Sequence, residues 1–353
     1  MQTHPTIDRS TITVLDAHGT PRHVGHMHGE HRREAVAEGL IRWKARLEET
    51  LGVDADAAIA RFLAEASFLP AIERHTPDLL EEVRGIAEGA NQPFDTILAY
   101  NLLDEAWEWV GAQLKPGCTS CGVREGGVPV IAQNMDIPDV HDGAQTVLRA
   151  HVDGKPPVIV LTYAGMIGLM GCNADGVAVV VNNLQVLPTA DDALPVAFVM
   201  RGVLERRTLA DAARFVTNVP HAIGQHYAIG SPDGLRAFEG SAAGVVELPA
   251  DAANYVHANH PLGDTPVRME TESVYQRSIT RERHAKAAEN LDASASIAGI
   301  KRALEDTETP VSFAPKKGFM TFGGMVMRLT VPPQVEVTAG PPHLSRWIPV
   351  GWS

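Results

Sequence analysis

The sequence predicts a mixed α+β protein in which a mostly helical first part precedes a strand-rich second part. Apolar residues spaced by three and four positions dominate up to about residue 117. Short runs rich in β-branched residues, separated by glycine-containing turns, dominate after it. Further helices divide these strands into groups, and alternation of this kind is typical of the α+β class. The sequence contains no internal repeat and no low-complexity segment.

The first part, residues 1–117, begins with a polar lead and a short strand at 10–15. The sequence predicts that helices begin at Asp54 and at Thr76-Pro77-Asp78, and that one ends at Asn91-Gln92-Pro93. Helices are expected at about 29–51, 54–68, 77–91 and 94–109.

The second part, residues 118–353, opens with a strand pair that turns at Gly126-Gly127. Strands are expected at about 118–136, 145–151, 158–163, 167–173, 176–182, 224–231, 235–240, 244–248 and 254–258, with a last hairpin at 322–339. Helices are expected at about 194–206, 208–217, 271–290 and 293–305. Residues from Gly340 onward are interpreted as a tail.

Composition limits the classes of protein that this chain can belong to. Its 353 residues allow one large or two ordinary domains, and 44% hydrophobic with 21% charged residues is a globular composition. The formal net charge of −13 argues against a nucleic-acid partner and against binding to an anionic membrane surface. No basic-apolar leader and no apolar run of spanning length is evident, so we expect a cytoplasmic protein. We expect no cofactor, and a homo-oligomer remains possible.

The cysteines and histidines raise two further possibilities. Cys118, Cys121 and Cys172 are too few for a disulfide framework. Cys118 and Cys121 form a C-x-x-C pair, but a β-hairpin follows where a redox motif would need a helix. His23, His26, His28 and His31 make a metal site conceivable, yet no thiolate or carboxylate shell completes it, and the neighbouring glycines fit a turn. We expect a solvated entry into the following helix here.

Gly117-Cys118-Thr119-Ser120 carries the main functional hypothesis. A thiol acts as a nucleophile when a base takes its proton, and a free α-amine, with a pKa of about 7.7–8.0, is such a base. Cys118 gains that amine only if the bond after Gly117 is cut. Glycine tolerates unusual backbone angles and leaves its carbonyl open to attack. We therefore predict self-cleavage by Cys118.

Several motifs, taken in order, resemble the isopenicillin-N acyltransferase family of autoproteolytic N-terminal-nucleophile cysteine hydrolases. The resemblance extends from about residue 10 to 340. It rests on Gly25-His26-Met27-His28-Gly29, on the segment from Gly117 to Gln133-Asn134-Met135-Asp136, on the run Gly171–Val179 followed by Asn182-Asn183-Leu184, and on Val256–Leu262. It implies a four-layer αββα sandwich of two antiparallel sheets between helices. Residues 1–117 would be a propeptide chain that stays folded with the 118–353 chain.

The resemblance also implies roles for individual residues. Asp136, eighteen residues after Cys118, would orient the amine and the thiol. Asn259 would hold the oxyanion, as would Asn182, for which Asn183 competes. The sequence departs from the family at Lys317, which stands in the region where the family has an arginine paired with the aspartate.

The predicted activity is cleavage or transfer of the acyl group of a small N-acylated amide through a thioester on Cys118. Two other classes stay open. One is an uncleaved, non-catalytic relative that binds a small molecule. The other is a papain-like enzyme that pairs Cys118 with His257 or His260, although the α-amine would leave these histidines a structural or pocket role.

Overall fold

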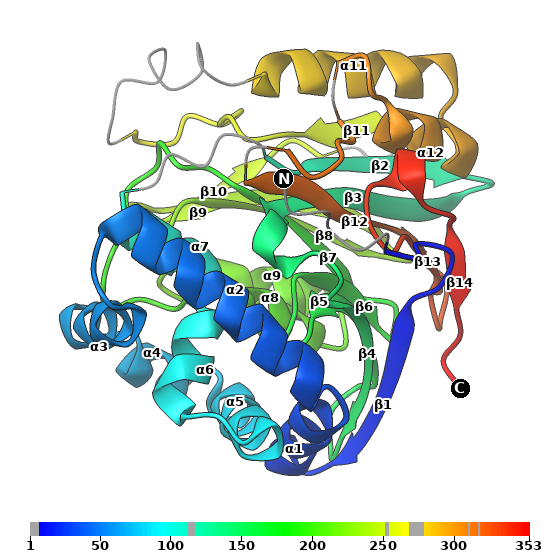
Figure 1. The fold of residues 1–353 in the computed structure, drawn as a ribbon. Coiled ribbons are helices and arrows are strands. Elements are labelled where there is room, and N and C mark those ends of the chain that lie inside the picture. Colours follow the sequence, from blue (N-terminus) through cyan, green and yellow to red (C-terminus); the bar gives the residue numbers. More distant parts are fainter. Residues whose placement is uncertain (1–6, 112–116, 251–253, 268–278, 310, 317) are drawn as a thin grey trace.

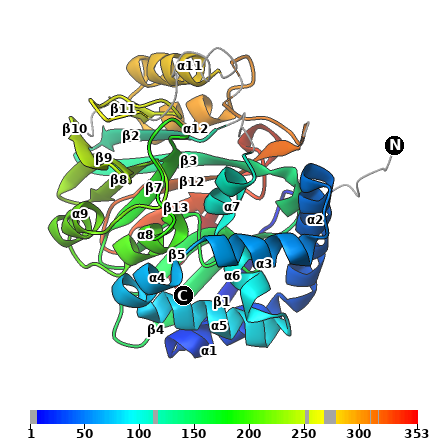
Figure 2. The same cartoon turned by 90° about the vertical axis from the view of Figure 1, so that its left-hand side faces the viewer.

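The computed structural model describes residues 7–111, 117–250, 254–267, 279–309, 311–316 and 318–353. Two sheets pack face to face between helical layers, which confirms the predicted α+β class and αββα order (Figure 1). Figure 2 shows α11 and α12 on one side of this sandwich and the helices of the first part on the other.

The larger sheet has eight strands and carries most of the helices. Its order is β1 (Thr13–Gly19), β4 (Gln145–Val152), β5 (Val158–Tyr163), β6 (Met170–Asn173), β7 (Ala178–Asn183), β8 (Gln225–Ser231), β9 (Gly234–Ser241) and β10 (Gly244–Leu248). The prediction of a purely antiparallel sheet is wrong at one edge, because β1 pairs with β4 in parallel. This parallel pair ties the start of the chain to the second part.

The smaller sheet has six strands and begins beside Cys118. Its order is β11 (Asn254–His257), β2 (Thr119–Glu125), β3 (Val128–Pro138), β12 (Phe319–Arg328), β13 (Gln334–Val337) and β14 (Ile348–Val350). The predicted turn is confirmed, since Gly126 and Gly127 both have positive φ. The expected C-terminal tail is wrong, because β14 pairs with β13.

The helices follow the predicted order with shifted boundaries. Below the larger sheet lie α1 (Pro21–His31), α2 (Arg33–Leu51), α3 (Ala55–Glu65), α4 (Leu69–His75), α5 (Pro77–Ala90), α6 (Phe94–Asn101), α7 (Leu103–Trp109), α8 (Val196–Leu204) and α9 (Leu209–Asn218). Over the smaller sheet lie α11 (Thr280–Ala293) and α12 (Ile297–Glu305). The helix predicted at 29–51 is the end of α1 followed by α2, and the one predicted at 94–109 is α6 followed by α7. The helix predicted at 54–68 is α3 alone, and α4 was not predicted. Most of 271–279 lies outside the described residues.

The glycine-histidine segment is part of a helix, so the predicted turn is wrong. Thr20 caps α1, and Gly25 and Gly29 let it cross α5 in close contact. A Cβ on Gly25 would lie 1.9 Å from the backbone oxygen of Glu82. His28 is fully buried and accepts a hydrogen bond from the backbone N–H of Gly165 at 3.0 Å. Within the described chain, no group of three or more potential metal ligands is found.

The two sheets are held in register by a buried amide. Gln133 of β3 donates to the backbone oxygen of Val181 in β7, and accepts from the N–H of the same residue at 3.1 Å. Ser120 lies opposite Gln133 in the β2–β3 pairing. The end of β7 and the start of β2 therefore meet between the sheets, next to Cys118.

Candidate active site

Cys118 lies directly before β2, buried between the sheets. Thr119 pairs with Asn134, which brings Cys118 beside the next residues of β3. Its thiol lies 3.4 Å from the Met135 sulfur and accepts the backbone N–H of Asp136 at 3.5 Å. Only 6% of Cys118 is exposed. The β2–β3 hairpin thus places the predicted nucleophile and the predicted aspartate side by side.

Arg283, on the buried face of α11, contacts the peptide that we predict to be cut. Its guanidinium donates to the backbone oxygen of Gly117 and, at 2.9 Å, to Oδ1 of Asn259. Longer contacts reach the Cys118 oxygen at 3.4 Å and Oγ1 of Thr119 at 3.3 Å. The carbonyl of Gly117 is therefore polarised by a buried positive charge.

Asp136 completes the charged centre. Its Oδ2 lies 3.8 Å from Nη1 of Arg283, and the Thr321 side chain, on the paired strand β12, is close enough to the carboxylate to lower its pKa. Burial raises the pKa of Asp136 to about 8, although the Arg283 charge opposes that rise. A carboxyl group with this pKa can gain and release a proton near neutral pH.

The thiol is unreactive by itself in the uncut chain. Burial, together with the Asp136 charge, raises the pKa of Cys118 to about 12. At neutral pH the thiol consequently keeps its proton until a neighbouring base removes it.

Asn259 packs against Gly117. A Cβ at position 117 would lie 1.9 Å from Oδ1 of Asn259, so only glycine fits without displacement. The Nδ2 of Asn259 donates to the backbone oxygen of Asn183 at 3.0 Å, and its backbone N–H donates to Oγ1 of Thr280 at 2.7 Å. In the uncut chain the predicted oxyanion donor is thus engaged elsewhere, and Arg283 contacts the Gly117 oxygen instead.

In the Asn182 side chain, only the amide oxygen has hydrogen-bond partners among the described residues. Its Oδ1 accepts hydrogen bonds from Oγ of Ser120 and from Nδ1 of His226, both at 2.7 Å. Burial holds the pKa of His226 well below its ordinary value, so the ring is neutral and its Nε2 is free to accept from the Tyr255 hydroxyl. The Nδ2 of Asn182 is buried and has no partner in the described part of the chain. A fixed, unsatisfied N–H donor is suited to an incoming oxyanion.

The two candidate histidines are already engaged. His257 contacts Oε1 of Glu239 at 3.3 Å through Nε2 and the Ala258 oxygen at 2.8 Å through Nδ1. Its ring stacks on His226 with centroids 3.7 Å apart. His260 contacts Oγ1 of Thr280 at 3.1 Å. With both ring nitrogens of His257 occupied, a papain-like pairing with Cys118 is not supported.

The C-x-x-C pair does not form a redox centre. Cys118 packs in the main hydrophobic cluster, whereas Cys121 packs in the cluster under α11 and α12. Residues an odd number of positions apart on a strand face opposite sides, which explains this separation. All three cysteines are free.

Sequence reasoning missed Arg283 and directed attention to Lys317, which lies outside the described residues. A usable signal was present, because Arg283, Ala287 and Leu291 are spaced by four positions. The last two are apolar, so Arg283 falls on the buried face of α11, where an arginine is unusual unless it is paired.

Two stacked sheets between helical layers, with a buried cysteine directly before a strand, are the arrangement expected of the N-terminal-nucleophile hydrolase class. More particularly, the chain belongs to the acyl-coenzyme A:6-aminopenicillanic acid acyl-transferase family, whose family model matches residues 123–324. The predicted resemblance and the prediction of an enzyme are confirmed. The matched region begins five residues after Cys118, so the roles of Gly117 and Cys118 stay predictions.

Individual relatives are more distant. An acyl-coenzyme A:6-aminopenicillanic-acid-acyltransferase 40 kDa form from Emericella nidulans is 26% identical over 252 residues, covering 69% of this chain and 68% of the relative. A mutant conjugated bile acid hydrolase from Clostridium perfringens is similar at 12% identity and a TM-score of 0.42, covering 67% of this chain and 97% of that one. A penicillin V acylase from Agrobacterium tumefaciens is similar at 14% identity and a TM-score of 0.38, covering 62% and 82%.

Across the described residues, no helix is both long and apolar enough to cross a membrane.

Proposed function

We propose that the chain cuts itself between Gly117 and Cys118 and then cleaves or transfers the acyl group of a small N-acylated amide through a thioester on Cys118. One observation carries the proposal. Arg283 contacts both the Gly117 carbonyl oxygen and the Asp136 carboxylate, while the Cys118 thiol lies against the backbone of Asp136. Electrophile, nucleophile and candidate base are thus gathered around one buried guanidinium.

In the first stage, Asp136 takes the proton of the Cys118 thiol. The sulfur attacks the Gly117 carbonyl carbon, and Arg283 stabilises the charge that develops on the oxygen. The carbon–nitrogen bond then breaks, and the leaving nitrogen takes up the proton to become the α-amine of Cys118. Water hydrolyses the resulting thioester, which leaves a Gly117 carboxylate, a free thiol and two chains, 1–117 and 118–353.

In the second stage, the new α-amine acts as the base for the thiol. The sulfur attacks the substrate carbonyl, the oxyanion is held by the free Nδ2 of Asn182, and the α-ammonium protonates the leaving amine. Ser120 and His226 keep the Asn182 side chain in one orientation. The thioester passes to water or to an acceptor amine, which gives hydrolysis or acyl transfer respectively.

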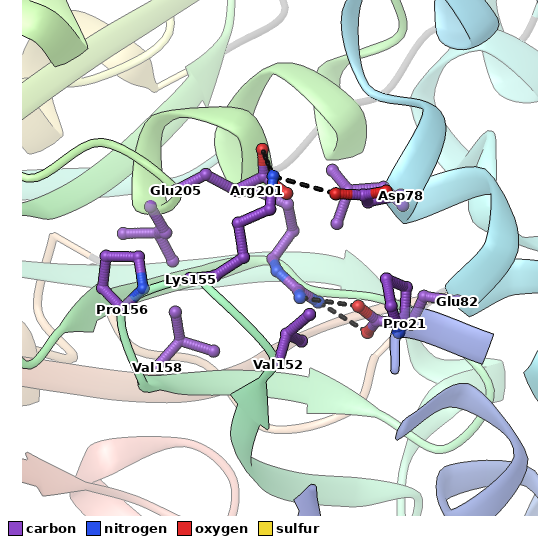
Figure 3. Close-up of a pocket in the computed structure, with 11 residues that line it drawn as sticks. Pro21, Asp78, Glu82, Val152, Lys155, Pro156, Val158, Arg201 and Glu205 are labelled. Atoms are coloured by element: carbon purple, nitrogen blue, oxygen red, sulfur yellow. Dashed lines mark hydrogen bonds and ion pairs between the residues drawn. The ribbon is translucent and has the colours of Figure 1, made fainter. Parts of the chain in front are cut away.

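The two chains are expected to stay together, because ion pairs join them and one of these pairs is buried. Figure 3 shows Arg201 of α8 directed at Glu82 of α5, with two contacts of 2.8 Å. Lys155 bridges Asp78 of the first chain and Glu205 of the second, at 2.9 and 3.3 Å. Removing one partner of a buried pair costs about 3–5 kcal/mol, so the Glu82–Arg201 pair opposes separation.

The test uses chromogenic N-acyl p-nitroanilides with the wild-type protein and the Cys118→Ala variant. Release of p-nitroaniline by the wild type, with an acyl adduct on Cys118 detected by mass spectrometry, is the expected result. The alanine variant should release none. A wild-type protein that remains one chain, forms no adduct and turns over no amide would favour the binding-protein alternative.

A further inference from the structure

A cavity lies beside the end of α7 and is lined with carboxylates. Its volume is about 220 Å³, enough for a group of several heavy atoms. Glu65, Glu105, Glu108 and Asp191 line it, and no Lys, Arg or His is among its lining residues within the described chain. We call it the acidic pocket.

Part of this acidity is already neutralised. Glu65 accepts from Arg61 at 2.7 Å and from the Trp109 indole at 2.6 Å, and the Arg61 guanidinium stacks on the Trp109 ring. A ligand charge would therefore be met by the deeper carboxylate, Glu105, and by Asp191 at the exposed rim.

Glu105 is the observation that indicates a ligand. It is 3% exposed, and its Oε1 accepts the backbone N–H of Val196 at 2.8 Å. Its Oε2 is buried without a partner among the residues described. Burial, reinforced by the neighbouring Asp104 charge, raises the pKa of Glu105 to about 8. With this pKa, Glu105 is largely protonated near neutral pH, and a cation in the pocket would favour its ionised form.

The pocket walls also suit an alkyl chain that carries the cation. Phe62, Phe68 and Trp109 line one part, and Ala222 and Ile223 line another. Methylene groups can pack against these side chains while a terminal charge reaches Glu105. Aromatic walls with carboxylates are chemistry for an ammonium or guanidinium group rather than for an anion.

The acidic pocket shares lining residues with a crevice that reaches the neighbourhood of Gly117. A narrow crevice shares Glu108, Thr189 and Ile223 with it and extends to Asp104 and Asn183. The backbone oxygen of Asn183 accepts the Asn259 amide, which packs on Gly117.

We propose that the acidic pocket binds a cationic ammonium or guanidinium group at the far end of the substrate's acyl chain. This inference rests on the proposed function and names its substrate class: amides whose acyl group carries a distal positive charge. Glu105 would provide the main counter-charge, and Asp191 would attract the cation at the rim.

The experiment compares 6-aminohexanoyl p-nitroanilide with heptanoyl p-nitroanilide, which differ only by an ammonium in place of a methyl group. Wild-type kcat/KM should favour the cationic substrate at least tenfold. Glu105→Gln, which keeps an oxygen for the Val196 N–H, should bring the ratio close to one by lowering kcat/KM for the cationic substrate. Glu247→Gln, the same charge change at an exposed residue of β10, should leave the ratio as in the wild type. If Glu105→Gln does not fold, Asp191→Asn at the exposed rim should lower the ratio severalfold.

A binding measurement separates this inference from the proposed function. Calorimetry should show hexylammonium binding at least tenfold more tightly than 1-hexanol to the wild type, and losing this preference in Glu105→Gln. If hexylammonium shows this preference and loses it in Glu105→Gln, but neither anilide is hydrolysed, the pocket assignment is supported and the proposed activity is wrong. Equal rates for both anilides with equal or absent binding of both small molecules overturn the pocket assignment. The pocket assignment is also overturned if folded Glu105→Gln and Asp191→Asn keep the wild-type preference for the cationic compounds.

Discussion

Replacing Arg283 by alanine tests the charged centre most sharply. The substitution removes the donor to the Gly117 oxygen and the cation next to Asp136 in one step. Loss of one oxyanion donor costs about 2.7–4 kcal/mol in known enzymes, or roughly 10²–10³ in rate. A second effect adds to this. With a pKa of about 8, about a quarter of Asp136 is ionised at pH 7.5. Without the Arg283 charge this pKa rises, and each further unit removes most of the ionised fraction.

Self-cleavage of Arg283→Ala should therefore be at least about 10³-fold slower than that of the wild type at pH 7.5. Arg283→Lys should fall between the two, because it keeps the charge but loses the two-pronged geometry. The assay is the fraction of uncut chain, followed by intact mass after cell-free synthesis. Arg281→Ala is the matched control, since Arg281 is an exposed arginine on the same helix. Circular dichroism checks that each variant folds. If folded Arg283→Ala cuts itself within about threefold of the wild-type rate, the role given to Arg283 is wrong.

Four further predictions follow from the same contacts. Gly117→Ala should remain uncut by intact mass, because its Cβ would lie 1.9 Å from Oδ1 of Asn259; cleavage at the normal rate would contradict this packing argument. Asn182→Ala should lower kcat on p-nitroanilides by about 10²-fold with little change in KM, and a change in KM alone would refute the oxyanion role. Self-cleavage should rise about 50-fold between pH 6 and 8, since the ionised fraction of a base with a pKa of about 8 grows from about 1% to one half. Asp136→Asn should abolish this rise, and a flat wild-type profile would exclude Asp136 as the base. Glu82→Ala should weaken association of the two chains by about 3–5 kcal/mol, measured by urea titration of the co-purified chains; an unchanged midpoint would show that the pair contributes little.

Local signals predicted much of the fold. Glycines at 126 and 127 identified the β2–β3 hairpin because two consecutive positive φ angles favour glycine. The order of strands and helices was predicted from periodicity. The parallel pairing of β1 and the pairing of β14 depend on partners far along the chain, and short strands carry too little pattern to indicate them.

Part of the candidate site was equally accessible from sequence. Cys118, Asp136 and Asn182 were indicated by motif order, and the β2–β3 and β2–β7 contacts bring them together. Arg283 was not, because its role depends on α11 lying across β2. The segment Gly25–Gly29 was misinterpreted as a turn. Its glycines allow α5 to cross α1 in close contact, but glycine is also common in turns, and only the position of α5 distinguishes the two cases.

The central claim is that Cys118 becomes an amino-terminal residue by breaking the bond to Gly117. Intact-mass measurement of the purified wild-type protein tests it most directly. The account predicts two species, one ending at Gly117 and one beginning at Cys118, and only a single full-length species for Cys118→Ala. An amide-hydrolysing wild type whose mass corresponds to one unbroken chain would contradict it.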